Sequence, residues 1–153
     1  MDTKGKDYKF YLNQLEDTLS LYLVKKAPAL PPGLKEFIVK YGPWITLVLI
    51  ILTLPLILAV FGLGTVLAPF SFMGGLRVGT GYIVTLVLSA VQLVLEAVAI
   101  PGLFKRQKKA WYLLYYAVLI GVVENVVRFD VGGLIIGSLL SLYILFQIRE
   151  YYK

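Results

Sequence analysis

Glu96 is the residue whose type and position point most directly to chemistry. It is the only acidic residue in the apolar stretch Gly81–Phe104, and Gln92 precedes it by one helical turn. A charged carboxylate near the centre of a bilayer costs about 2.5–3.5 kcal/mol on insertion scales. Glu96 is therefore expected to be protonated, paired or turned toward water.

The Gln92–Glu96 pair has two interpretations. In the functional one, the pair is a proton- or cation-responsive site in a small transporter. In the structural one, a protonated Glu96 forms a hydrogen bond with a neighbouring helix, through Tyr115, Tyr116 or Ser141. The structural interpretation is favoured.

A second polar cluster lies at the outer end of the apolar stretch 111–127. Glu124 and Arg128 are spaced i, i+4 with the acid first, the order that favours an ion pair on a helix. Asn125 lies beside them, and Asp130 can cap the following hairpin or share Arg128. The cluster predicts an ion-pair clasp of Glu124, Arg128 and Asp130, with an outward-facing binding site as the alternative.

Several kinds of chemistry are excluded by composition. The chain has no cysteine and no histidine, which excludes the usual Cys/His zinc sites, haem held by those residues and nucleophilic sites of the Ser–His or Cys–His type. Glu96 and Glu124 are expected at different depths, which disfavours a paired-acid site. We therefore expect no enzyme activity, no cofactor and no metal.

The elements that position these residues are four apolar stretches, at about 43–62, 81–104, 111–127 and 132–148. The apolar fraction is 59% and the mean hydropathy is +0.80, well above ordinary soluble domains. The stretches approach or reach the roughly 20 residues that a spanning helix needs. The sequence predicts an all-α, integral membrane four-helix bundle over residues 34–153, with a kink at Pro55. The short hairpin at 128–130 makes the last two spans antiparallel.

An N-terminal segment, residues 1–33, precedes this domain. Residues 8–24 show the spacing of an amphipathic helix that is too polar to span, and residues 27–33 form a proline-rich linker. The apolar face is expected to lie on the membrane or to pack on the cytoplasmic side of the protein. A docking helix for a partner is the alternative.

Two connecting segments are predicted around the first span. A short helix at 34–41 is expected to break at Gly42-Pro43. The glycine-rich, apolar residues 62–80 are expected to form a loop partly submerged at the outer interface, with a re-entrant segment as the alternative.

Basic residues predict the orientation of the spans. Of the 15 Lys and Arg residues, all except Arg77 and Arg128 fall before the first span, between spans two and three, or after the last span. The positive-inside rule then places both termini in the cytoplasm. The middle loop with Lys105, Arg106, Lys108 and Lys109 fixes topology and can hold anionic lipid head groups. Because the basic residues flank apolar stretches, we expect no nucleic-acid partner.

Small residues recur at four-residue spacing in the last two spans. They are Ala117 and Gly121 in the third, and Gly133, Gly137 and Ser141 in the fourth. Such ridges allow close approach of helix backbones in lipid. We expect them to pack spans three and four together, with homo-oligomerisation as the alternative.

Three segments carry a resemblance to a protein group. LPPGLKEFIVKYGPW at 30–44, PGLFKRQKKAW at 101–111 and residues 133–153 resemble small bacterial four-span membrane proteins. The resemblance implies a location in the bacterial inner membrane and supplies no catalytic residue.

The leading functional hypothesis is a non-enzymatic structural, accessory or partner-binding bundle. Its partners would be the lipid bilayer and a membrane protein or a second copy of the chain. The alternative is a small oligomeric transporter or channel that uses Glu96.

Overall fold

The structure is a computed structural model that describes the backbone of residues 3–153 and the side chains of residues 8–52, 55, 58, 59 and 61–153. Residues 1 and 2 of the predicted N-terminal segment lie outside the described part. Residues 3–153 are about 90% helical and contain no strands, which confirms the all-α class. The helices are α1 (Thr3–Ser20), α2 (Pro32–Ser71), α3 (Leu76–Phe104), α4 (Lys108–Arg128) and α5 (Leu140–Gln147). Shorter π- or 3₁₀-helical turns are η1 (Leu21–Lys26), η2 (Phe72–Gly74), η3 (Gly133–Leu139) and η4 (Arg149–Tyr151).

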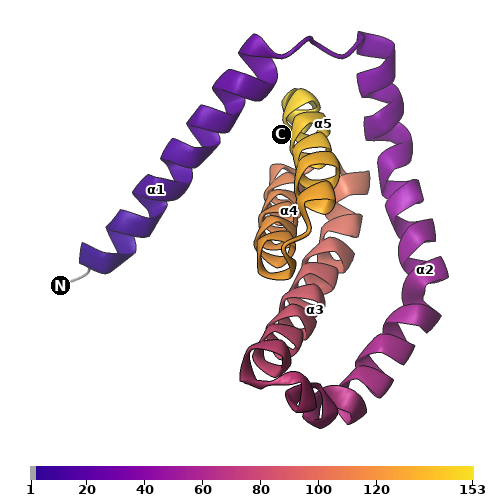
Figure 1. Ribbon diagram of the computed structural model, residues 1–153. Helices are drawn as coiled ribbons and strands as arrows, with labels where there is room; N and C mark the ends of the chain where they lie inside the picture. Colours follow the sequence, from indigo (N-terminus) through magenta and orange to yellow (C-terminus); the bar gives the residue numbers. More distant parts are fainter. Residues whose placement is uncertain (1–2) are drawn as a thin grey trace.

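Helices α3, α4 and α5 pack together, with α2 along one side and α1 diverging on the other (Figure 1). We call the end with the linker Ala27–Pro31, the α3–α4 turn and the C-terminus the basic end. The opposite end holds the α2–α3 turn and the turn after α4. The segment η3–α5 runs antiparallel to α4, as expected from the short hairpin, because Trp111 bonds to Leu145 near one end and Asn125 to Ser138 near the other.

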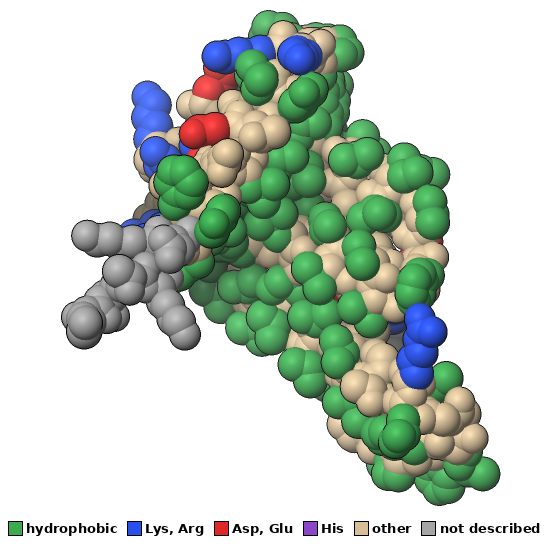
Figure 2. All heavy atoms as spheres, turned by 60° about the vertical axis from the view of Figure 1, so that its left-hand side comes forward, with side chains coloured by type: hydrophobic (Ala, Val, Ile, Leu, Met, Phe, Trp, Pro, Cys, Tyr) green, Lys and Arg blue, Asp and Glu red, His purple; other side chains and the backbone are tan. Residues whose placement is uncertain are grey.

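Within the part of the chain that the structure describes, two helices, α3 and α4, are long and apolar enough to cross a membrane. Among the described residues, Phe61–Gly74 and Gly133–Gln147 are shorter apolar helical stretches. Figure 2 shows charged side chains gathered around the basic end and hydrophobic side chains over much of the remaining face. The structure therefore supports two candidate spans, while four spans go beyond it.

The predicted break at Gly42-Pro43 is wrong, because these residues lie inside α2, a single helix of 40 residues. Helix α2 begins at Pro32, where the missing N–H of proline costs nothing. Val39 and Pro43 are both buried and lie one turn apart, on the face that packs toward α3 and the C-terminal residues. This packing offsets the hydrogen bond lost at the internal proline. Figure 1 shows α2 bending along its length, with Pro55 inside it.

The predicted loop at 62–80 is also wrong. Helix α2 runs to Ser71, the tight turn η2 follows, and α3 begins at Leu76 rather than at Gly81. Gly75 makes the reversal with a φ of 103°, a conformation that favours glycine. Gly64 permits close packing of α3, since a Cβ there would lie 2.8 Å from the Tyr82 hydroxyl. A helix also satisfies the backbone N–H and C=O groups of this apolar segment, which has few polar side chains to pair with them.

The small residues do not form one packing ridge between α4 and the last helix. Ala117 is buried, but Gly121 faces Gln92 of α3 and Gly133 lies against the Asp130 carboxylate. Gly137 has open space around it and Ser141 is exposed. The reason is the π-helical geometry of η3, which shifts the register so that Ser138 turns inward. Gly137 therefore does not pack against α4, whereas Ser141 lines a pocket together with Leu114 and Val118 of that helix.

Candidate functional site

A polar seam runs along the interface of α3 with α4. Ser89, Gln92 and Glu96 are spaced three and four residues apart, so they share one face of α3. The Gln92 amide donates to the Glu96 carboxylate over 3.0 Å. Gly121 on α4 makes room for this amide, because a Cβ there would lie 3.3 Å from the Gln92 side-chain oxygen. We call Ser89, Gln92, Glu96 and Glu124 the polar seam.

The predicted partners of Glu96 on other helices do not bind it. Glu96 accepts its hydrogen bond from Gln92 of its own helix. The Tyr115 hydroxyl is buried without a hydrogen-bond partner among the described residues, and Tyr116 and Ser141 are exposed. Sequence spacing could reveal the pair on one helix, but the rotation of α4 and α5 about their axes depends on tertiary packing.

Glu124 is held from two helices. Its carboxylate lies 3.4 Å from the Arg128 guanidinium, which confirms the predicted ion pair. It also accepts a 2.9 Å hydrogen bond from the Ser89 hydroxyl of α3. The side chain of Glu124 is 12% exposed and that of Arg128 is 56% exposed, so the pair joins a buried acid to a base near the surface. The sequence analysis missed Ser89, although its spacing from Gln92 was a usable signal.

The turn after α4 is capped as predicted. The Asp130 carboxylate accepts a 2.8 Å hydrogen bond from the Gly133 N–H, so Asp130 caps the hairpin rather than sharing Arg128. Phe129 adopts the left-handed conformation, with a φ of 56°. The Asn125 amide donates to the Ser138 hydroxyl over 3.1 Å. Ser138, which the sequence analysis also missed, completes a clasp between α4 and η3.

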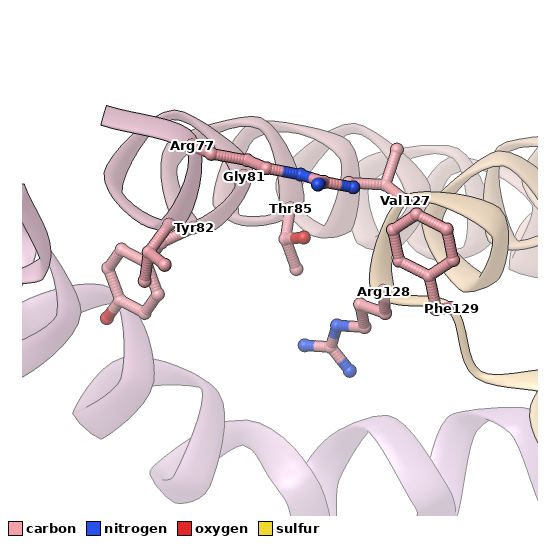
Figure 3. A pocket seen from close by; sticks show the side chains of 8 residues that line it. Arg77, Gly81, Tyr82, Thr85, Val127, Arg128 and Phe129 are labelled. Atoms are coloured by element: carbon pink, nitrogen blue, oxygen red, sulfur yellow. The ribbon is translucent and has the colours of Figure 1, made fainter. Parts of the chain in front are cut away.

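A pocket of about 460 Å³ opens at the opposite end, between the start of α3 and the end of α4. It is lined by Arg77, Val78, Gly81, Tyr82, Thr85, Val127, Arg128 and Phe129. Figure 3 shows Arg77 extended along α3 toward Val127, and Arg128 reaching into the space below Thr85. The Arg77 guanidinium lies 5.6 Å from the centre of the Phe129 ring. Two residues that are 51 positions apart thus bring positive charge to one pocket.

The basic end is closed by contacts between the two ends of the chain. Gln147 is 2% exposed, donates to the Leu23 carbonyl over 2.8 Å and accepts from the Leu30 N–H over 3.3 Å. Arg149 pairs with Glu16 of α1 and lies 4.9 Å over the Trp111 ring. These bonds anchor η1 and the linker, so α1 leaves the packed helices from a fixed base.

Only part of the amphipathic face of α1 and η1 is covered. Leu19 and Leu23 pack against the core, in line with packing on the protein itself. Along the same helical segment an exposed stripe remains, whose members are 41–66% exposed: Tyr8, Tyr11, Leu15 and Tyr22.

The basic loop is held by the C-terminus. Lys108 donates its N–H to the Lys153 carbonyl over 2.8 Å, and Lys153 donates to the Arg106 carbonyl over 3.0 Å. Lys105, Arg106, Lys108 and Lys109 are all exposed, so their side chains are free to meet solvent or lipid head groups. Burial raises the pKa of Tyr152, next to this loop, and nearby Arg106 offsets part of that rise. The phenol therefore stays neutral at physiological pH.

Among the described side chains, no group of three or more acidic residues is arranged to hold a metal ion. No protein-family model, curated protein or solved structure matches the chain. A function is therefore inferred from the geometry of the residues of the chain itself.

Proposed function

We propose that the chain is a four-span membrane protein, with both termini and the α3–α4 turn in the cytoplasm, and that it acts as a non-enzymatic accessory protein. Besides α3 and α4, the first span would be α2 from about Pro43 onward, and the fourth span would be η3 with α5. Their apolar sequences, the exposed apolar side chains and the collection of Lys and Arg at the basic end support this arrangement. We propose the bacterial inner membrane as its location, which is what the resemblance in the sequence implies.

The accessory role rests on one observation: α1 is anchored at its C-terminal end and leaves an apolar stripe uncovered. Arg149 and Gln147 fix the C-terminal end of α1 and the following turn η1, while four apolar side chains remain exposed: Tyr8, Tyr11, Leu15 and Tyr22. Large aromatic side chains of this kind are enriched in protein interfaces. The polar seam supports the same role, because Glu96 and Glu124 both have partners within the protein.

The accessory role predicts a partner that depends on the stripe. A photo-crosslinking amino acid at exposed Phe10, next to the stripe, should capture one protein in native membranes. The triple variant Tyr8→Ser, Tyr11→Ser, Leu15→Ser should lose it, because truncation removes the apolar contact area. Mass spectrometry of the crosslinked product measures the yield.

The matched control is Lys9→Ser with Asn13→Ser, exposed positions of the same helix outside the stripe. The control should keep the crosslink. Equal yields from both variants would contradict partner binding, and crosslinks to lipid alone would assign the stripe to the membrane surface.

The alternative is a small transporter in which Glu96 responds to protons or cations. Glu96→Gln separates the two functions, because the substituted amide oxygen still accepts the bond from Gln92. We expect the free energy of unfolding to change by no more than about 0.5 kcal/mol. Under the accessory role, potassium and proton flux into proteoliposomes should stay at the level of empty vesicles with either chain. Flux carried by the unmodified chain and abolished in Glu96→Gln would favour the transporter instead.

A further inference from the structure

The two arginines at the opposite end stand apart from all other basic residues. Arg77 is the only Lys or Arg between Lys40 and Lys105, and Arg128 is the only one between Lys109 and Arg149. Both line the same pocket. Membrane topology does not explain them, since the positive-inside rule disfavours basic residues at this end. The presence of both arginines in one pocket therefore suggests that they bind a ligand there.

The charge of the pocket is not balanced by the protein groups that face it. Glu124 pairs with Arg128 from beneath, where its side chain is 12% exposed. Asp130 is directed to the Gly133 N–H. The first turn of α3, which contains Arg77, has no acidic residue, and the positive end of the helix dipole adds to the potential there. The pocket therefore keeps a positive potential that an anion would neutralise.

The two guanidinium groups are also held in position before any ligand binds. Arg77 lies over the Phe129 ring, and Arg128 is oriented by Glu124, which Ser89 holds in turn. A guanidinium offers a fork of N–H donors that matches the oxygens of a phosphate. At about 460 Å³ the pocket exceeds the volume of a phosphate group and falls within the usual range for small-molecule sites.

From this geometry we infer that the pocket binds a phosphate group between Arg77 and Arg128, and that the phosphate belongs to an anionic phospholipid. The second part rests on the proposed membrane location, because the pocket then lies at the level of the lipid head groups. Val78 and Val127 give the pocket an apolar wall that suits the glycerol and upper acyl region. A free phosphate ester has the same head chemistry without the apolar part.

The test is hydrogen exchange, measured by mass spectrometry, of peptides covering 76–85 and 126–130 in the full chain. The protein is placed in phosphatidylcholine nanodiscs alone, with phosphatidylglycerol added, or with inorganic phosphate added. When the concentration of phosphatidylglycerol is about ten times its dissociation constant, the local opening that permits exchange should become about tenfold rarer, and exchange should slow by the same factor. Arg77→Gln with Arg128→Gln should abolish this slowing.

Two further variants keep the test decisive. Lys105→Gln with Lys109→Gln changes the charge equally at the basic end and should leave the slowing at 76–85 intact. Arg77→Lys with Arg128→Lys keeps both charges but removes the fork of N–H donors. This variant should retain a weaker slowing of exchange, so the test stays decisive even where the glutamine variant folds poorly.

The outcomes separate the sources of phosphate. Slowing by inorganic phosphate alone would support the phosphate site and overturn the lipid assignment. No slowing by either ligand would overturn the inference. Failure of the membrane location would appear separately, as a monodisperse protein purified without detergent.

Discussion

Replacing Trp111 by alanine should lower the free energy of unfolding by about 3–5 kcal/mol. Trp111 is fully buried, stacks on Tyr115 with ring centres 5.5 Å apart and meets Phe146 edge to face at 5.4 Å. Its indole N–H donates to the Leu145 carbonyl over 2.8 Å. The substitution therefore removes ring contacts and leaves a buried carbonyl without its donor.

Trp44→Ala is the matched control, because the second tryptophan is 58% exposed and contacts Phe104 at 5.0 Å. It should cost no more than about 1.5 kcal/mol, the range of one exposed aromatic pair. Far-UV circular dichroism during denaturant unfolding in detergent micelles measures both variants. Equal losses of stability in the two variants would mean that the basic end has no tightly packed core around Trp111.

Replacing Gln147 by leucine should release η1 and the linker without unfolding α3 or α4. The buried amide satisfies the Leu23 carbonyl and the Leu30 N–H, and each buried backbone group left unpaired costs about 1–3 kcal/mol. Local opening toward water is the cheaper response. Hydrogen exchange of residues 21–31 should therefore accelerate about 10–100-fold, which corresponds to about 1.4–2.8 kcal/mol.

The control for this change is Gln14→Leu, at an exposed position of α1. It removes the same side chain and should leave exchange at 21–31 unchanged. Peptides from α3 and α4 serve as internal references in both variants. The Tyr143 hydroxyl also donates to the Pro28 carbonyl of the linker, over 2.6 Å. Unchanged exchange after Gln147→Leu would show that this bond and the Arg149–Glu16 ion pair hold the linker without the glutamine.

Local sequence spacing was sufficient wherever the interacting residues lie within one or two helical turns. The Glu124–Arg128 ion pair and the Asp130 cap follow from separations of four and three residues. The non-helical linker Ala27–Pro31 follows from its prolines, which remove backbone donors. In the same way, the apolar composition and length of residues 81–104 and 111–127 predicted helices able to cross a membrane.

The interactions that the sequence could not predict join residues far apart along the chain. Gln147 bonds to Leu23 and Leu30, which lie 124 and 117 positions away, and Arg77 lines the same pocket as Arg128, 51 positions further on. Spacing rules carry no information about such pairs, because they depend on how each helix is rotated about its axis. The missed Ser138 shows this directly, since one π-helical segment changes which side of the helix faces α4.

For this protein, the sequence alone determined the helical class, the linker and the polar contacts made within one or two turns, because these depend on local hydrogen bonding and side-chain periodicity. Tertiary structure alone decided that α2 continues through Gly42-Pro43 and residues 62–71. The intrinsic cost of glycine and proline in a helix is a few kcal/mol, and packing against α3 and the C-terminal residues is large enough to offset it. Packing of α3 against α4 places Arg77 and Arg128 at one pocket at the opposite end.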